Sequence, residues 1–235
     1  MNDSLLPLPE WAQVLAVFDT ETTGIAYDTT RIVTANISVL RADGSVESSL
    51  DWLINPGIEI PEQATAVHGI TTAHAREHGE DAAGAVYDIV QELQALFDSG
   101  IAVVAYNAAY DFSILQREAV RYSHDPLSNP SPIVDPLVID KQLDRYRKGK
   151  RTLEAVSAHY GVSLTSAHTA AADAVAAGHV AQAIAAKYAS ELSLSALELH
   201  NSQIDWAAAQ AESFNKYLKD SGKPYQPTSG QWPVR

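Results

Sequence analysis

Two acidic residues, Asp19 and Glu21, lie one position apart at the end of the apolar run 14–18. In a β-strand, side chains alternate between the two faces, so both carboxylates project to the same side while Thr20 points away. Two ionised carboxylates held close together repel each other unless a cation lies between them. The sequence therefore predicts a site for a hard divalent metal ion at the end of a core strand.

Three further residues have suitable chemistry to join this pair. Asp111 lies about one turn into a predicted helix, and His168 and Asp173 are five positions apart at the start of an alanine-rich stretch. Positions five apart on a regular helix point about 140° away from each other, so these two cannot share one helix face. We therefore expect His168 in the loop before the helix, facing back towards a carboxylate on the early turns.

The elements that must position these residues follow from the hydrophobic pattern and the turn signals. The predicted strands are 14–18, 31–40, 46–54, 101–105 and 133–134, with a hairpin turn at 42–45. The predicted helices are 82–97, one capped by Asn107, one beginning at Asp135-Pro136, 152–159, 169–189 and 197–219. A three-stranded meander followed by alternating helix and strand indicates an α/β fold with a mixed sheet covered by helices.

The length of 235 residues and the hydrophobic content of 46% allow one substantial core. We predict one domain at 10–190, followed by a C-terminal helix and an extended tail at 191–235. In that helix, a stripe at helical spacing is expected to pack back onto the domain: Ile204, Ala208, Ala211, Phe214 and Leu218. The alternative is that this helix docks a DNA polymerase or a second copy of the chain.

The composition excludes several classes of protein. The absence of cysteine excludes disulfides, thiolate zinc sites and cysteine nucleophiles, and it fits the expected cytoplasmic location. The first eleven residues lack the pattern of a signal peptide, and the alanine-rich stretch carries charges that a membrane span would avoid. We therefore expect no membrane association.

The charge balance limits how the chain can meet nucleic acid. A formal net charge of −13 disfavours sequence-independent coating of a duplex. One local exception is a basic run, whose members are Arg145, Arg147, Lys148, Lys150 and Arg151. This run is either a solvated loop or a contact for a phosphate backbone.

The motifs around these residues resemble those of a known family. Val17-Phe18-Asp19-Thr20-Glu21-Thr22-Thr23-Gly24 resembles the first motif of the DEDDh family of 3′→5′ exonucleases. Segments 107–111 and 167–174 resemble its second and third motifs, and 67–71 is similar to a substrate-contacting segment. The family includes the proofreading subunit of bacterial DNA polymerase III, ribonuclease T and oligoribonuclease. The resemblance spans roughly Val14 to Lys187.

The resemblance implies a ribonuclease H-like fold with a mixed five-stranded sheet and two bound Mg²⁺ or Mn²⁺ ions. By analogy, Asp19 bridges both ions, Glu21 and Asp173 complete one site, and Asp111 supports the other. A two-metal site can activate water and stabilise the leaving 3′-oxygen of a phosphodiester. His168, whose intrinsic pKa is near neutrality, suits the role of general base. The expected reaction is 3′→5′ hydrolysis of single-stranded ends that releases 5′-mononucleotides.

The resemblance also implies a set of substrate contacts, namely Thr22, Gly24, His68, Asn107 and Tyr110. Two of these have structural alternatives: His68 can simply close a turn before Gly69, and Tyr110 can pack in the core instead of stacking on the terminal base. One position departs from the family, because Tyr106 stands where a histidine usually precedes the asparagine of the second motif.

Several functions remain open within this interpretation. DNA is slightly favoured as substrate, with an RNA-trimming enzyme as the alternative, because the distinction depends on contacts to one 2′-hydroxyl. A proofreading subunit that works with a polymerase, or a binding module without catalysis, are further alternatives. The intact set of acidic residues and His168 argues against the binding module.

Overall fold

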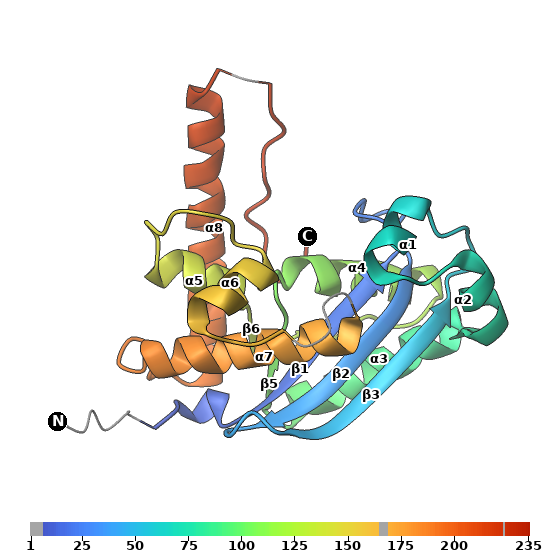
Figure 1. Cartoon of the computed structure of the whole chain (residues 1–235), viewed down its shortest axis with the longest axis horizontal. Coiled ribbons are helices and arrows are strands. Elements are labelled where there is room, and N and C mark those ends of the chain that lie inside the picture. Colours follow the sequence, from blue (N-terminus) through green and yellow to red (C-terminus); the bar gives the residue numbers. More distant parts are fainter. Residues whose placement is uncertain (1–6, 165–168, 223) are drawn as a thin grey trace.

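The chain folds around a mixed β-sheet with helices on both faces (Figure 1). The computed structural model describes residues 7–164, 169–222 and 224–235. The strands are β1 (Val14–Thr22), β2 (Ile32–Arg41), β3 (Val46–Asn55), β4 (Glu80–Asp81), β5 (Ala102–Val104) and β6 (Ile133–Val134). The helices are η1 (Glu10–Ala12), α1 (Glu62–His68), α2 (Thr72–His78), α3 (Ala82–Asp98), α4 (Ala109–Arg121), α5 (Pro136–Leu143), α6 (Leu153–Tyr160), α7 (Ala170–Lys187) and α8 (Ala196–Asp220).

The strand order of the sheet is β4-β3-β2-β1-β5-β6. β1 pairs antiparallel with β2 and parallel with β5, and β5 pairs parallel with β6. The predicted meander and the mixed sheet are confirmed. Because β1, β5 and β6 run in the same direction, their carboxyl ends meet at one edge of the sheet. Polar residues that follow these three strands are therefore brought to the same place.

The described sheet has six strands, so the expected number of five is wrong. The additional strand is β4, whose two residues pair with Ile54 and Asn55 at the end of β3. A strand of two residues between two helices is too short to show the alternation by which strands are recognised in a sequence.

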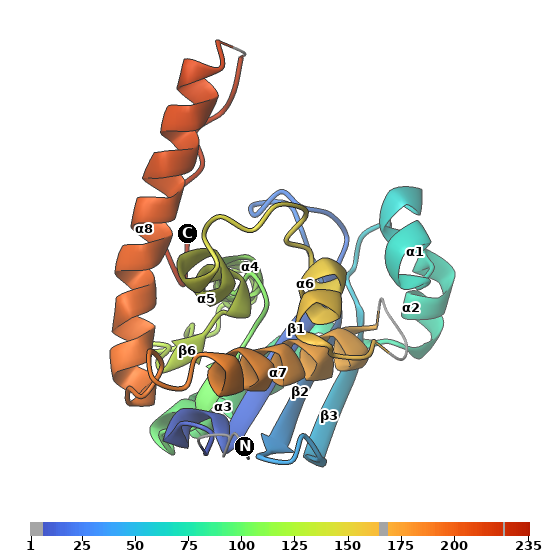
Figure 2. The same cartoon turned by 60° about the vertical axis from the view of Figure 1, so that its left-hand side comes forward.

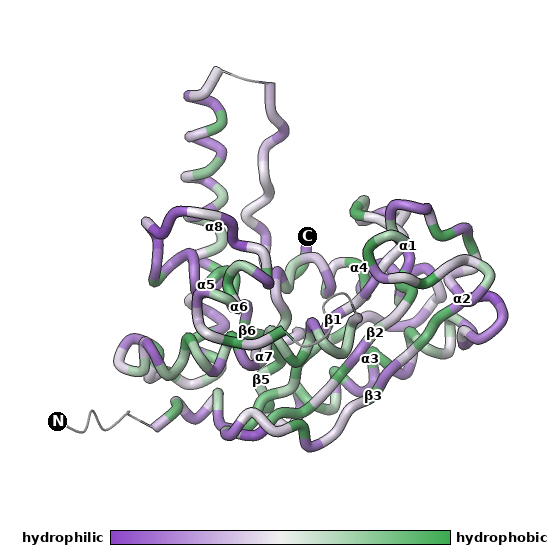
Figure 3. The backbone as a smooth tube through the Cα atoms, in the orientation of Figure 1, coloured by the Kyte–Doolittle hydropathy of each residue, from purple (hydrophilic) through white to green (hydrophobic). Residues whose placement is uncertain are grey.

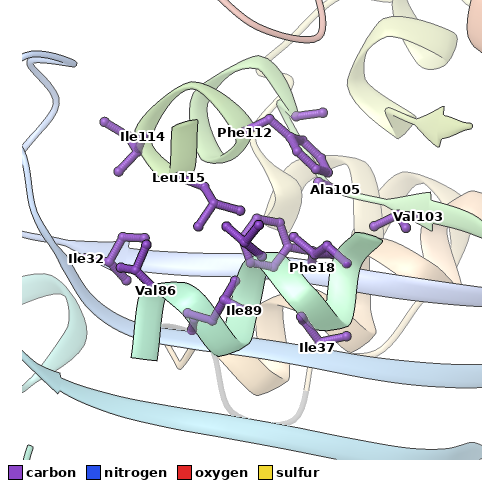
Figure 4. Close-up of a cluster of buried hydrophobic side chains, with 14 of the residues drawn as sticks. Phe18, Ile32, Ile37, Val86, Ile89, Val103, Ala105, Phe112, Ile114 and Leu115 are labelled. Atoms are coloured by element: carbon purple, nitrogen blue, oxygen red, sulfur yellow. The ribbon is translucent and has the colours of Figure 1, made fainter. Parts of the chain in front are cut away.

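Alternation along β1 divides its side chains between two cores. Ala16 and Phe18 belong to the core under α3 and α4, whereas Leu15 and Val17 belong to the core under α7. In Figure 4, Phe18 lies among side chains of the α3 and α4 side, including Phe112. Each fully buried side chain of this size contributes roughly 1.5–3 kcal/mol relative to an exposed one. The register of β1 is therefore fixed by burial on both faces.

A glycine lets α7 lie close against the sheet, as Figures 1 and 2 show from two sides. A Cβ atom at Gly178 would lie 2.6 Å from Cγ1 of Val17 and 2.9 Å from Cδ2 of Leu40. Both distances are too short for any other residue unless the helix or these two side chains shift. The predicted helix 169–189 is thus confirmed as α7, with a contact that fixes its height above β1.

The structure differs from the sequence-based interpretation in two places, which are the segment between β3 and α3 and the start of α4. α1 and α2 were not predicted, since each has seven residues and too few apolar positions to show a helical period. The prediction that Asn107 caps α4 is wrong, because the N-cap is Ala108 and no side chain caps that helix. Asn107 instead has a φ of 64°, the left-handed conformation that asparagine tolerates in tight turns.

The C-terminal helix α8 packs on the domain up to Gln210, whose side chain donates to the carbonyl of Val138 on α5 at 3.0 Å. Leu199, His200 and Gln203 are buried there, while the end of the helix extends beyond the body and the tail returns along it (Figures 1 and 2). The predicted stripe is not the main packing face, because Ile204 and Phe214 are 40% and 50% exposed, and of its members only Ala211 is buried. Polar groups explain the difference: the amide of Gln203 bonds to the backbone of β6, which hydropathy spacing cannot reveal.

Candidate active site

Asp19 and Glu21 lie at the carboxyl end of β1, and both are half-buried. Alternation places them on the same face as Leu15 and Val17, which is the face covered by α7. Thr20 lies between them in sequence and points to the opposite face.

Asp111 reaches this edge of the sheet from the other face. It lies in the first turn of α4 and is almost fully buried, with 3% of its surface exposed. Its Oδ1 accepts hydrogen bonds from the backbone N–H of Thr20 (3.1 Å) and from the Thr20 hydroxyl (2.7 Å). Thr20 therefore fixes Asp111 to β1 between the two positions that carry Asp19 and Glu21.

The electrostatics of Asp19 show that four carboxyl groups are close to one another. The pKa of Asp19 is raised well above its ordinary value by burial, and further by Asp111, Glu21 and Asp173. Asp173 lies in the first turn of α7, whose N-cap is Thr169. Burial likewise raises the pKa of Asp111 to about 7, even though the hydrogen bonds from Thr20 lower it. The structure thus brings together all four predicted carboxylates, while His168 lies outside the described residues.

The chemistry of these side chains suits a hard cation. Carboxylate oxygens are the ligands that Mg²⁺ and Mn²⁺ prefer, and a divalent ion would relieve the mutual repulsion of the four groups. Within 7–164, 169–222 and 224–235, no three His, Asp or Glu side chains are already arranged to hold a metal ion. The carboxylates would therefore have to rotate towards a common centre to ligate one.

Tyr110 holds the loop that follows β1. Its hydroxyl donates a hydrogen bond to the carbonyl of Gly24 and lies 2.6 Å from Oγ1 of Thr22. Its ring is 5.9 Å from that of Tyr27, and burial raises the pKa of Tyr110 to about 12. The hydroxyl is thus occupied in shaping the first-motif loop, and Thr22 and Gly24 are positioned by it.

His68 lies at the end of α1, across a cleft from Glu21. Its Nδ1 accepts a hydrogen bond from the N–H of Ile70 at 3.1 Å, so it does close the turn. Its buried Nε2 makes no hydrogen bond of regular geometry with a described residue, and the backbone of Thr22 is near enough to act on the ring. His68 and Glu21 both line a cleft of about 240 Å³, together with Thr169 at the start of α7. Burial lowers the pKa of His68, which favours a neutral ring facing that cleft.

Asp135 is a functional residue that the sequence analysis assigned only to a helix start. It does cap α5, accepting the N–H of Leu137 at 2.9 Å. Its carboxylate also accepts the N–H groups of Asn107 and Ala108, both at 3.0 Å, and Nε1 of Trp232 at 3.3 Å. Asp135 thereby fixes the loop that carries Asn107 into α4. The sequence signal that could have revealed this role is the position of Asp135 directly after β6, a strand that runs in the same direction as β1.

Tyr106, which departs from the family pattern, is turned away from the carboxylates. Its hydroxyl donates to the carbonyl of Arg151 at 2.7 Å, and burial raises its pKa. The tyrosine therefore ties the second motif to the segment between α5 and α6.

The basic run divides into paired and unpaired members. Arg147 and Arg151 both form ion pairs with the buried carboxylate of Asp140. The exposed members are Arg145, Lys148 and Lys150, in the segment between α5 and α6 that is strongly hydrophilic in Figure 3. A part of the run is thus structural, and only the remainder is available to a phosphate backbone.

The mixed sheet with helices on both faces places the chain among α/β proteins with a ribonuclease H-like fold. Residues 16–181 match the family described as Exonuclease (RNase_T), and the chain belongs to this family.

Two relatives illustrate the similarity in sequence. The chain is 27% identical over 188 residues to a DNA polymerase III PolC-type protein of Lacticaseibacillus paracasei, covering 80% of this chain and 12% of that protein. It is 29% identical over 164 residues to a DNA polymerase III subunit epsilon-like protein of Rhodobacter capsulatus, covering 68% of this chain and 22% of the relative. The chain thus spans less than a quarter of the length of these two relatives.

Solved structures support the fold. Exonuclease I from Methylocaldum szegediense superposes with a TM-score of 0.64 at 20% identity, covering 88% of this chain and 45% of that one. E. coli exonuclease I in complex with a dA16 oligonucleotide gives a TM-score of 0.63 at 18% identity, covering 76% of this chain and 42% of that one.

No helix in the described part of the chain is long and apolar enough to cross a membrane.

Proposed function

We propose that this chain is a metal-dependent 3′→5′ exonuclease that releases 5′-mononucleotides from single-stranded ends. The observation that carries the proposal is the convergence of Glu21, Asp111 and Asp173 on Asp19 at the carboxyl end of β1. Nothing in the described chain offers Asp19 a positive partner, and the family match supports a phosphodiester as the substrate.

Each carboxylate has a distinct task in this proposal. Asp19, which faces the other three, would contact both of two Mg²⁺ or Mn²⁺ ions, with Glu21 and Asp173 at one ion and Asp111 at the other. When bound, such ions activate water and stabilise the leaving 3′-oxygen. Thr20 keeps Asp111 in place through its two hydrogen bonds. His168 would take the proton from the attacking water, as its near-neutral intrinsic pKa allows.

Single-stranded DNA is the substrate that we favour. The similar exonuclease I of E. coli has been solved with a DNA oligonucleotide, and the sequence relatives carry names of DNA polymerase III proteins. Those names also support the second candidate, a proofreading subunit that acts together with a polymerase. The RNA-trimming alternative is distinguished from both by sugar preference.

The test uses 5′-labelled single-stranded DNA and its RNA counterpart, incubated with the wild-type chain and with Asp19→Ala. Each reaction contains Mg²⁺, Mn²⁺ or EDTA. We expect a metal-dependent ladder that shortens from the 3′ end, is faster on DNA and is absent with Asp19→Ala. No ladder from folded protein under any condition would contradict the proposal and favour a partner-dependent subunit or a binding module.

The role of His168 has its own test. His168→Ala should lower the rate by about 10²–10⁴-fold, the usual contribution of a general base. Metal affinity, measured by calorimetry, should be nearly unchanged, and His159→Ala serves as a control in an exposed helical position. Loss of metal binding in His168→Ala would identify His168 as a ligand instead.

A further inference from the structure

A second and larger cleft lies between α5 and the C-terminal hairpin, by which we mean α8 and the returning tail (196–222 and 224–235). Its volume is about 530 Å³. In Figures 1 and 2 the hairpin extends beyond the domain on the α5 side and its tail ends near α4. We call this the hairpin cleft; the lining residues that matter below are Asn107, Lys141, Arg145, Phe214, Tyr217 and Arg235.

The hairpin cleft is basic in a strongly acidic chain. Four Lys or Arg residues line it against one acid, Asp135, although the chain has 16 basic and 29 acidic residues. The oxygens of Asp135 already accept four N–H groups of the protein, although its charge still acts on Lys141. One of the four cations, Arg151, is paired with Asp140. Three cations therefore remain to attract an anion.

Of these cations, Lys141 gives the strongest indication that the cleft binds an anion. It is half-buried on α5 and makes neither a hydrogen bond nor an ion pair with any described residue. A lysine ammonium loses hydration when it is buried, and an unpaired one is therefore costly unless an anion approaches it. Burial is the largest influence and lowers the pKa of Lys141; Arg151 and Arg235 also lower it, whereas the carboxylates of Asp135 and Asp140 raise it. This arrangement suits a phosphate group.

The hairpin cleft begins at the edge of the candidate active site. Asn107 lines it four residues before Asp111. Arg235 also lines it, and its Nη1 donates to the hydroxyl of Tyr27 at 2.9 Å. Tyr27 in turn contacts the ring of Tyr110, which holds the first-motif loop. These contacts place one end of the hairpin cleft beside α4 and the first-motif loop, which both belong to the candidate active site.

Two aromatic side chains of α8 line the outer part of the cleft. Phe214 and Tyr217 are 50% and 67% exposed, and their rings are stacked at 6.4 Å with an angle of 22°. Exposed aromatic rings beside a basic groove are typical of proteins that bind single strands, because every base can stack on them. Such stacking contributes about 1–3 kcal/mol per base.

We propose that the hairpin cleft binds the single-stranded nucleic acid upstream of its 3′-terminal nucleotide. Lys141 and Arg145 contact backbone phosphates, and Phe214 and Tyr217 stack against bases. The inference rests on the proposed exonuclease function, to which it adds the path of the strand. A protein partner in the same cleft is the competing occupant that the experiment must exclude.

The experiment compares two double variants that remove the same charge. Lys141→Met with Arg145→Met removes cations inside the cleft, while Lys148→Met with Lys150→Met removes exposed cations outside its lining. Dissociation constants of oligothymidylates and oligouridylates of 12 nucleotides are measured with Ca²⁺, and hydrolysis of the dinucleotide and the 12-mer with Mg²⁺.

We expect the cleft variant to bind the 12-mer about tenfold more weakly and the control variant to stay within twofold. For two lost phosphate contacts, the plot of the logarithm of the association constant against the logarithm of the salt concentration should become less steep by about 1.4. Hydrolysis of the dinucleotide should stay within twofold of the wild-type rate. Unchanged 12-mer binding, equal weakening in the control, or an equal loss on the dinucleotide would each overturn the inference; the first of these favours a protein occupant.

A second double variant, at two exposed positions, keeps the test valid if the first variant misfolds. Phe214→Ala with Tyr217→Ala changes residues on the outer surface of α8 and should also weaken the 12-mer about tenfold while sparing the dinucleotide. If the wild-type chain binds the 12-mer in this cleft but hydrolyses neither substrate, the proposed function fails and the binding site stands. If the wild-type chain hydrolyses both substrates and neither cleft variant changes 12-mer binding, the proposed function stands and the binding site in the cleft is wrong.

Discussion

Asp19 lies at the carboxyl end of β1 and Asp135 directly follows β6, a strand of the same direction, yet their surroundings are opposite. Asp135 accepts hydrogen bonds from three backbone N–H groups and from the indole of Trp232. Asp19 instead faces three other carboxylates, every one of which raises its pKa. Burial raises the pKa of both groups, but only Asp135 has hydrogen bonds that oppose the rise.

The difference separates two uses of a buried acid. A carboxylate whose oxygens are filled by N–H donors stabilises the chain that supplies them. A carboxylate surrounded by like charge destabilises the protein by itself and is suited to a ligand of opposite charge. The first arrangement makes Asp135 a positioning residue, and the second supports our proposal that Asp19 is a ligand of the metal ions.

The largest effect should come from Asp19→Asn. Losing the shared metal contact removes several kcal/mol of transition-state stabilisation, which corresponds to a fall in rate of about 10³-fold or more. In EDTA at pH 8 the same variant should melt a few degrees higher than the wild type, because it removes one repelling charge. Melting curves and the ladder assay together check this. A lower melting temperature would show that Asp19 is satisfied by the protein itself and would break the comparison.

Asp135→Asn should behave in the opposite way. An amide keeps one acceptor oxygen but places N–H donors against the N–H groups of Asn107 and Ala108, which we expect to cost about 3 kcal/mol. The melting temperature should fall by roughly 6–12 °C. Asp125→Asn, at an exposed position, is the matched control. If the two variants melt alike, Asp135 contributes no more than a surface acid.

The same contrast explains which parts of the molecule the sequence could predict. Asp19 and Glu21 were predicted to share a face from alternation alone, since the apolar residues before them fix the register of β1. The role of Asp135 depends on donors from residues 107, 108 and 232, which meet only after the fold has formed. Local patterns carry no trace of such contacts.

The missed helices and the misplaced cap have different causes. α1 and α2 are too short for a period to be visible. Asn107 is a good capping residue by type, but the bond from its N–H to Asp135 and its positive φ place it outside the cap position. Only for Asn107 does a tertiary contact override a local preference.

A smaller effect, on pH dependence, tests Asp111. Its pKa is raised to about 7, so the folded metal-free protein binds more protons than the unfolded chain between pH 4 and 7. The contribution of Asp111 to stability therefore falls as pH rises through this window. In EDTA, Asp111→Asn keeps an acceptor for Thr20 and should gain about 2 kcal/mol over the wild type between pH 5 and 8. Denaturant titrations at both pH values measure the gain, and a difference that does not change with pH would contradict it.

The smallest effect concerns the donor that the tail supplies to Asp135. Trp232→Phe keeps an aromatic ring beside His200, whose ring centre is 5.0 Å away, and removes only the indole N–H. The lost hydrogen bond to a charged acceptor should cost about 1 kcal/mol, because its length of 3.3 Å makes it the longest of the four. A double-mutant cycle with Asp135→Asn separates this bond from lost packing, since the two changes should be less than additive only if the bond matters. Full additivity would mean that the tail stabilises the domain through packing of Trp232 alone, and that the backbone donors suffice to satisfy Asp135.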